Sequence, residues 1–147
     1  MTTFSYPVNI TRHEPLAGDT VNMQQARVPA QYSVVVDTSK TGTAAGTTTI
    51  PLFVAPAGSK FYECVLDITT AFDNTTTNIQ VGTSASTGIL YAATTANTAG
   101  RRAYAGTAAQ VSANAIALTV DTTIQAIVSI DTSAVTAGSV IVHVVVI

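Results

Sequence analysis

FYECVLDITTAFDNTTTNIQVG, residues 61–82, carries the clearest structural pattern in this chain. Tyr62, Cys64, Leu66, Ile68 and Phe72 share one parity, while Glu63, Asp67, Thr69 and Ala71 share the other. This is the period of a strand that buries one face. Residues 73–77 are polar and of the types that form tight turns, and alternation resumes over residues 78–82. The pattern predicts a β-hairpin whose apolar side faces a core.

Strand patterns continue on both sides of this stretch. Residues 32–37, 47–54, 116–121 and 124–131 alternate in strand-like fashion, and residues 139–147 form a last, largely apolar strand. In the second of these, Ile50, Leu52 and Val54 are expected to face inward, and Pro51 favours an edge strand. Residues 38–46 are expected to be a loop, and residues 89–93 either a helical turn or a lone strand. About seven to nine short strands with hardly any helical period predict an all-β, antiparallel β-sandwich, jelly-roll-like, over residues 32–147.

The final strand is apolar on both faces. Val140, Val142, Val144 and Val146 share one parity, and Ile141, Val145 and Ile147 share the other. Such a strand is either covered on both sides or stacked against another subunit. Ile141, His143 and Val145 are therefore candidate contact residues, although His143 can also be read as a lone polar residue on the outward face.

Residues 1–31 are expected to form an extended arm, because three prolines there prevent continuous helix. Within it Phe4, Tyr6, Val8 and Ile10 alternate with polar residues and Pro7, a pattern that a plain disordered tail does not require. Pro7 permits only an edge strand. Fully extended, the arm would reach at most about 100 Å. These four residues are candidate contacts to a neighbouring subunit, and the alternative is a flexible tail.

Residues 94–107, TTANTAGRRAYAGT, are expected to be a long loop of small residues. Arg101 and Arg102 are adjacent, with Tyr104 beside them. A pair of arginines next to an aromatic ring can contact a carboxylate or a partner surface. The alternative is that both arginines are simply solvated.

The composition narrows the possible functions. Of the 147 residues, 47% are hydrophobic and only 10% are charged, against about 25% charged in an ordinary soluble domain. A surface of hydroxyl and methyl groups indicates assembly. The net charge of -2, without a basic patch, argues against nucleic acid as a partner. The start has no export signal, and the longest apolar run, residues 140–147, is too short to span a membrane, so we expect synthesis in the cytoplasm and no membrane partner.

The residue types used in catalysis are too few or too far apart. Cys64 is the single cysteine and lies on the inward parity, which excludes an internal disulfide and favours a buried, inert thiol. His13 and His143 lie in unrelated contexts, so a metal pair is not expected. Glu63 and Asp67 are about 13 Å apart along one strand face, too far for paired carboxylate chemistry.

The acidic turn residues give no metal site either. Asp73 and Asn74, even with Asp121 or Asp131, match no known calcium-binding spacing, and their expected role is to form turns. We therefore predict no catalytic residues, no cofactor, no metal and no enzymatic activity.

Several segments resemble known proteins. They are VLDITTAFD (65–73), NIQVGT (78–83), GIL (88–90), DTTI (121–124) and TAG (136–138). Together they resemble small virion proteins of tailed bacteriophages, and within that group the head decoration, or cement, proteins. The resemblance covers roughly residues 47–147 and does not extend to the arm.

The resemblance implies a jelly-roll-like β-sandwich on the outside of an icosahedral head. Such proteins commonly form trimers that bridge capsid subunits and add no enzymatic step. We therefore expect a homotrimer that is made in the host cytoplasm, binds the major capsid protein on the capsid surface and stabilises the lattice. The alternative is a receptor- or carbohydrate-binding β-sandwich of a phage spike or fibre, which would use Arg101, Arg102 and Tyr104.

Overall fold

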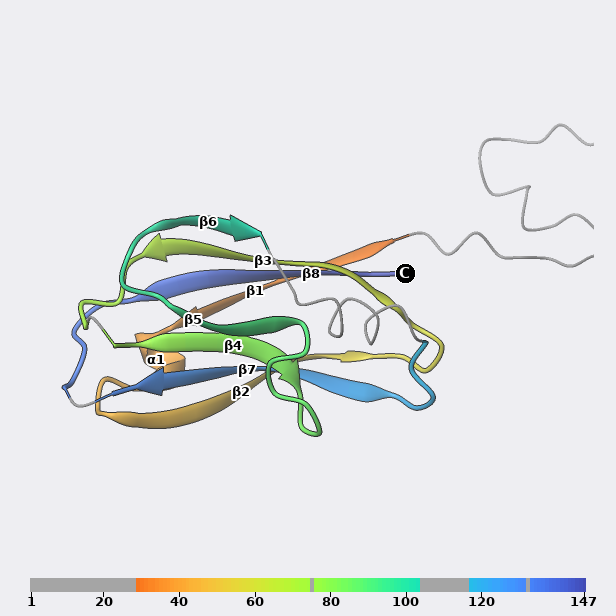
Figure 1. Ribbon diagram of the computed structural model, residues 1–147, viewed down its shortest axis with the longest axis horizontal. Helices are drawn as coiled ribbons and strands as arrows, with labels where there is room; N and C mark the ends of the chain where they lie inside the picture. Colours follow the sequence, from red (N-terminus) through yellow and green to blue (C-terminus); the bar gives the residue numbers. More distant parts are fainter. Residues whose placement is uncertain (1–28, 75, 104–116, 132) are drawn as a thin grey trace, which may run out of the picture.

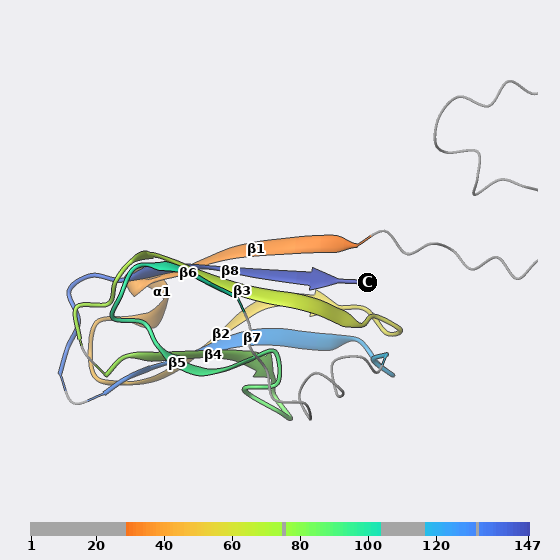
Figure 2. The same ribbon diagram turned by 45° about the horizontal axis from the view of Figure 1, so that its top comes forward.

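The computed structural model describes residues 29–74, 76–103, 117–131 and 133–147. Eight strands make two four-stranded antiparallel sheets that face each other, in the order β1-β8-β3-β6 and β2-β7-β4-β5 (Figures 1 and 2). The elements are β1 (Ala30–Asp37), α1 (Thr38–Thr41), β2 (Gly46–Ala55), β3 (Phe61–Thr70), β4 (Asn78–Thr83), β5 (Tyr91–Thr95), β6 (Gly100–Ala103), β7 (Thr122–Ile130) and β8 (Ser139–Val146). The prediction of an all-β, antiparallel sandwich is confirmed.

Strand pairing in the two sheets is nested. β1 pairs with β8, β2 with β7, β3 with β6 and β4 with β5, while β3–β8 and β4–β7 pairing completes each sheet. Each connection between consecutive strands therefore crosses from one sheet to the other, except the one from β4 to β5. Nearly all pairing is consequently between residues far apart in the sequence.

The predicted hairpin over residues 61–82 is wrong, because β3 and β4 lie in different sheets. Between them the chain crosses the sandwich, and Phe72 is buried in the crossing. The polar residues that follow bond to a distant segment and do not close a hairpin. Asn74 donates to the carbonyls of Asp131 and Ser133, at 3.1 and 2.6 Å. Period-two alternation shows that a strand buries one face, but it does not show which strand is its neighbour.

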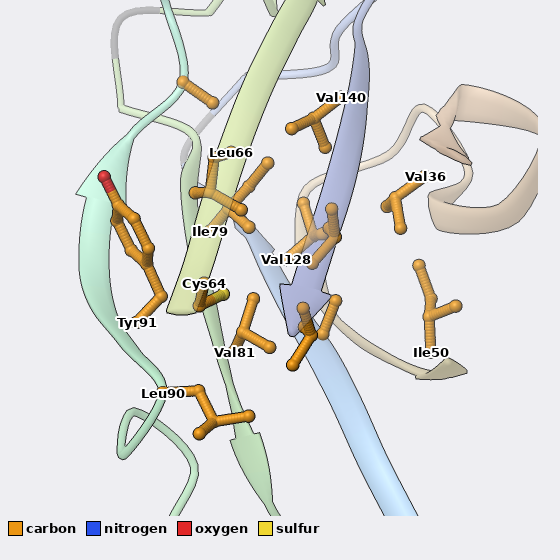
Figure 3. Close-up of a cluster of buried hydrophobic side chains, with 14 of the residues drawn as sticks. Val36, Ile50, Cys64, Leu66, Ile79, Val81, Leu90, Tyr91, Val128 and Val140 are labelled. Atoms are coloured by element: carbon orange, nitrogen blue, oxygen red, sulfur yellow. The ribbon is translucent and has the colours of Figure 1, made fainter. Parts of the chain in front are cut away.

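The core lies between the two sheets and is made of aliphatic side chains from both (Figure 3). The inward face of β8 follows the predicted parity, with Val140, Val142, Val144 and Val146 at most 4% exposed. Cys64, Leu66 and Ile68 of β3 are likewise buried, as predicted. Opposite them, Figure 3 shows Ile79, Val81 and Val128 pointing into the same layer. The alternation read from the sequence therefore identifies most of the core correctly.

Two residues predicted to face inward are exposed. Tyr62 is 73% exposed and Val54 is 57% exposed. The pairing register shifts between Phe61 and Glu63 in β3, and between Pro51 and Phe53 in β2. An extra residue in one strand reverses the parity of the residues beyond it. Simple alternation therefore fails for Tyr62 and Val54.

Three further segments differ from the sequence interpretation. Residues 117–120 of the predicted strand 116–121 are not strand, and Leu118 instead exchanges backbone hydrogen bonds with Gly58 and Ser59. The expected loop after β1 contains the short helix α1, where the Asp37 side chain caps the N–H of Ser39. Of the apolar piece 89–93, residues 91–93 belong to strand β5, which pairs with β4, and so they are neither a helical turn nor a lone strand. The prediction that β2 is an edge strand is confirmed.

Candidate partner-contact surfaces

The outward face of the β1-β8-β3-β6 sheet carries the candidate residues of the final strand. Ile141, His143 and Val145 alternate with the buried valines of β8, and all three are half-buried. The register aligns Val35, Ile141, Asp67 and Arg101 in one row across the four strands, and Ser33, His143, Val65 and Ala103 in the next. We call this surface the outer face. It combines apolar and charged side chains, a mixture found at protein interfaces.

His143 is not a lone polar residue. Its Nδ1 lies 2.8 Å from Ser33 Oγ and 3.4 Å from Gln31 Nε2, both on β1. These contacts tie the imidazole to the neighbouring strand and fix its orientation on the outer face. The alternation in the sequence correctly placed His143 on the outward face. It could not predict the contacts with Gln31 and Ser33, because these residues lie more than 100 positions away in the sequence.

The prediction that Arg101 and Arg102 lie in a loop is wrong, because both belong to strand β6. As neighbours in a strand, their side chains point to opposite faces of the sheet. Arg101 is exposed and lies opposite Asp67 in the register. Arg102 donates to the carbonyls of Thr95 and Thr98, at 2.6 and 3.2 Å. Because β5 and β6 are edge strands of different sheets, Arg102 joins the two sheets along this side of the sandwich. Its guanidinium therefore has a structural role.

The opposite side of the sandwich is joined by aromatic rings. Tyr32 of β1 and Phe53 of β2 stack with their centroids 3.9 Å apart and their planes within 2°. Both rings are half-buried, at the side where the edge strands of the two sheets lie. Stacked aromatic pairs contribute about 0.5–1.5 kcal/mol beyond their buried area.

The remaining candidates lie outside the described residues. Phe4, Tyr6, Val8 and Ile10 belong to residues 1–28, and Tyr104 follows the last described residue of β6. The structure does show where the described part of the chain begins. β1 begins at Ala30, which pairs with Val146 beside the C-terminus (Figure 1).

Sequence reasoning missed exposed apolar side chains at that end of the molecule. Val54 pairs with Thr123 where β7 begins, and Val120, 64% exposed, lies just before that strand. Tyr62 lies next to Phe61, whose partner Val146 ends β8. The two register shifts that expose Val54 and Tyr62 have no clear signal in the sequence.

The groups considered for chemistry have structural surroundings. Burial raises the pKa of the Cys64 thiol to about 12, which makes it a poor nucleophile. Among the described residues, no group of three His, Cys, Asp or Glu side chains could hold a metal ion. No helix within the described part of the chain is long and apolar enough to cross a membrane.

Asp73 fixes the crossing between the sheets to the turn before β8. Its carboxylate accepts hydrogen bonds from the Thr136 hydroxyl and, at 2.9 Å, from the Thr136 N–H. These two bonds hold the pKa of the Asp73 carboxyl below its ordinary value. The interaction therefore stabilises the fold above the unfolded pKa of about 4, and its contribution is lost as the pH falls through the lower pKa of the folded state.

We predict that Asp73→Asn lowers the melting temperature at neutral pH, and that its difference from the wild type shrinks below about pH 4. Thermal melts between pH 2 and 7 would measure this. Thr136→Val is the matched variant, since it removes the hydroxyl donor and should reproduce the same trend more weakly. If the melting temperature of Asp73→Asn stays below that of the wild type by the same amount down to pH 2, the stabilising role assigned to the Asp73 carboxylate is wrong.

Comparison with known proteins identifies the fold. No protein-family model matches the chain, and no curated protein matches it. Two solved structures do match. A chain of the cyanophage Pam1 capsid asymmetric unit superposes with a TM-score of 0.55 at 20% identity, over 92% of this chain and 94% of that chain. A chain of the acidic stable capsid structure of Helicobacter pylori bacteriophage KHP30 gives 0.51 at 14% identity, over 82% and 91%. At these identities the likeness shows a shared fold.

Proposed function

We propose that this protein is a non-enzymatic structural protein of a phage virion. In this proposal it binds the outside of the capsid, contacts the major capsid protein and stabilises the lattice by bridging its subunits. The observation that carries the proposal is the fold likeness to chains of two phage capsid structures, one of them over 92% of this chain and 94% of the other.

The strand order also supports the proposal. The nested pairs β1–β8, β2–β7, β3–β6 and β4–β5 are those expected when a long hairpin winds into a double-sheet jelly roll. Jelly rolls recur in viral capsid proteins and in lectins. The same arrangement is therefore compatible with the carbohydrate-binding alternative, and the choice between the two depends on the surface.

The surface favours the capsid role. A glycan or receptor site built on Arg101 and Arg102 would need both guanidinium groups on one surface, whereas Arg102 is bonded to backbone carbonyls next to β5. The outer face offers instead the apolar side chains of Ile141 and Val145, with His143 between them and all three half-buried, as a contact surface. A protein that binds only the assembled lattice stabilises that lattice by mass action.

We expect the purified protein to be a homotrimer and to co-sediment saturably with virus particles that lack it. Bound protein should also raise the temperature at which the particles rupture, because it binds intact lattice only. Light scattering gives the oligomeric state, and pelleting gives the stoichiometry. A stable monomer at micromolar concentration, or no protein in the pellet, would contradict the proposal.

A further inference from the structure

The four edge strands of the sandwich differ in how well they are protected. β2 carries Pro51 and a register shift, β5 has five residues and an irregular pairing with β4, and β6 has four residues. All eight residues of β1 pair with β8 without a shift, and β1 contains no proline. Within the described part of the chain β1 has one strand neighbour. A long, regular edge of this kind is a template for a further strand.

Half of this edge is blocked by the helix that follows it. Lys40 of α1 donates its ammonium protons to the carbonyl oxygen of Val35, so that carbonyl points away from β8. Backbone groups alternate in direction along a strand, and Gln31 and Ser33 therefore present their N–H and C=O to the same open side. The short Ser33–His143 contact agrees, because side chains are closer in pairs without mutual backbone hydrogen bonds. The open part of the edge is residues 30–34.

We infer that this open edge receives residues 4–10 from the arm of a second copy, which pairs there as an added strand. The segment alternates apolar and polar residues, as an added strand does. Pro7 lacks an N–H and shares the parity of Ser5 and Asn9, so the backbone groups that face β1 must be those of the other parity. Tyr6 and Val8 then supply the hydrogen bonds.

A second copy fits better than the same chain. Each chain has one arm and one open β1 edge, so exchange of arms fills every edge when the copies are arranged in a closed ring. Pro29 leads directly into β1 at Ala30, so a chain that paired with its own edge would have to reverse direction before this residue. The stacked rings of Tyr32 and Phe53, half-buried at the β1 and β2 edges, offer apolar surface beside the added strand. The inference deepens the proposed function by specifying how its copies are joined.

Proline substitutions test the backbone pairing. Ser33→Pro removes an outward N–H without touching the bonds to β8, and Ser33→Ala removes only the hydroxyl. We expect Ser33→Pro to weaken self-association about tenfold or more and Ser33→Ala to change it little. In the arm, Val8→Pro should have the same effect and Asn9→Pro should not, because the N–H of Asn9 faces away. Sedimentation equilibrium measures the association. Equal association for both members of each pair would overturn the inference.

Disulfide trapping identifies the copy that supplies the arm and does not depend on how well the proline variants fold. A tagged chain with Ser5→Cys is mixed with an untagged chain carrying Gln31→Cys, which shares its face in a parallel added strand, or Ala30→Cys, which shares its face in an antiparallel one. Asn9→Cys replaces Ser5→Cys in a second pair of mixtures to allow for register. Cys64 is buried and does not compete. We expect a disulfide between tagged and untagged chains. The inference is wrong if none of the mixtures cross-links, or if a chain carrying both cysteines links only within itself.

The two proposals fail separately. Absence of cross-links together with intact binding to capsids would refute the arm exchange and leave the capsid role standing. Cross-linked copies that do not bind capsids would refute the capsid role and leave the exchange.

Discussion

Removal of residues 1–28 is expected to leave a folded sandwich that no longer binds capsids. All core residues of the described structure lie between Val36 and Val146, so the free energy of unfolding should change by less than about 1 kcal/mol. The deletion removes Phe4, Tyr6, Val8 and Ile10, the arm residues proposed to make contacts. Binding should fall at least about a hundredfold, which corresponds to about 2.7 kcal/mol.

The control for this truncation keeps the arm but destroys its alternation. Exchanging Tyr6 with Pro7 and Val8 with Asn9 preserves composition and length, and it divides the four apolar side chains between the two faces, because Phe4 and Ile10 keep their parity. This variant should bind as weakly as the truncated chain, because an added strand needs its apolar residues on one face. Pelleting with particles measures both proteins. Undiminished binding by the truncated chain would show that neither the arm nor the joining of copies through it is needed for capsid binding.

Phe72→Ala is expected to reduce the free energy of unfolding by about 3–5 kcal/mol. The ring is 1% exposed, and it fills the place where the chain crosses between β3 and β4. It packs so closely on Gly138 that a Cβ at that glycine would lie 2.3 Å from Phe72 Cδ1. Hydrogen bonds from the Phe72 N–H to Ala96 and from the Thr136 N–H to Asp73 hold the surrounding backbone in place. We therefore expect the cavity left by the ring to stay open.

Urea denaturation measures this loss, and Phe53→Ala is the matched control. Phe53 is half-buried and stacked at the edge, so its truncation should cost clearly less than that of Phe72. Equal losses for the two variants would show that the crossing is not the tightly packed point of the fold.

The sequence predicts the strands well where alternation is uninterrupted. β7 and β8 lie within a residue or two of their predicted bounds, and Cys64, Leu66 and Ile68 are buried as expected. Alternation depends on local burial alone, and it holds as long as the register is regular. One extra residue in β3 or β2 is enough to expose Tyr62 and Val54.

Strand partners could not be predicted in the same way. The hairpin over residues 61–82 failed because a turn-forming sequence also suits a crossing between sheets, where Asn74 and Asp73 bond to residues 131–136. Arg101 and Arg102 lie in β6, a strand without alternating apolar residues. This segment is a strand because it pairs with β3, which the local sequence does not show.

The candidate contact surface was only partly predictable. The parity of β8 placed Ile141 and Val145 on the outer face, but the link from His143 to Ser33 and the open edge of β1 depend on pairing between the two ends of the chain. Such features require the topology, and the topology is set by long-range contacts that local patterns do not encode.

The most direct test of the proposed capsid role is a pair of cryo-electron microscopy maps, from virus particles with and without this protein. We predict that the difference map shows density of sandwich shape on the outside of the capsid shell, repeated with three-fold clusters and in contact with more than one capsid subunit. Identical maps, or difference density confined to the interior or the tail, would contradict the proposed function.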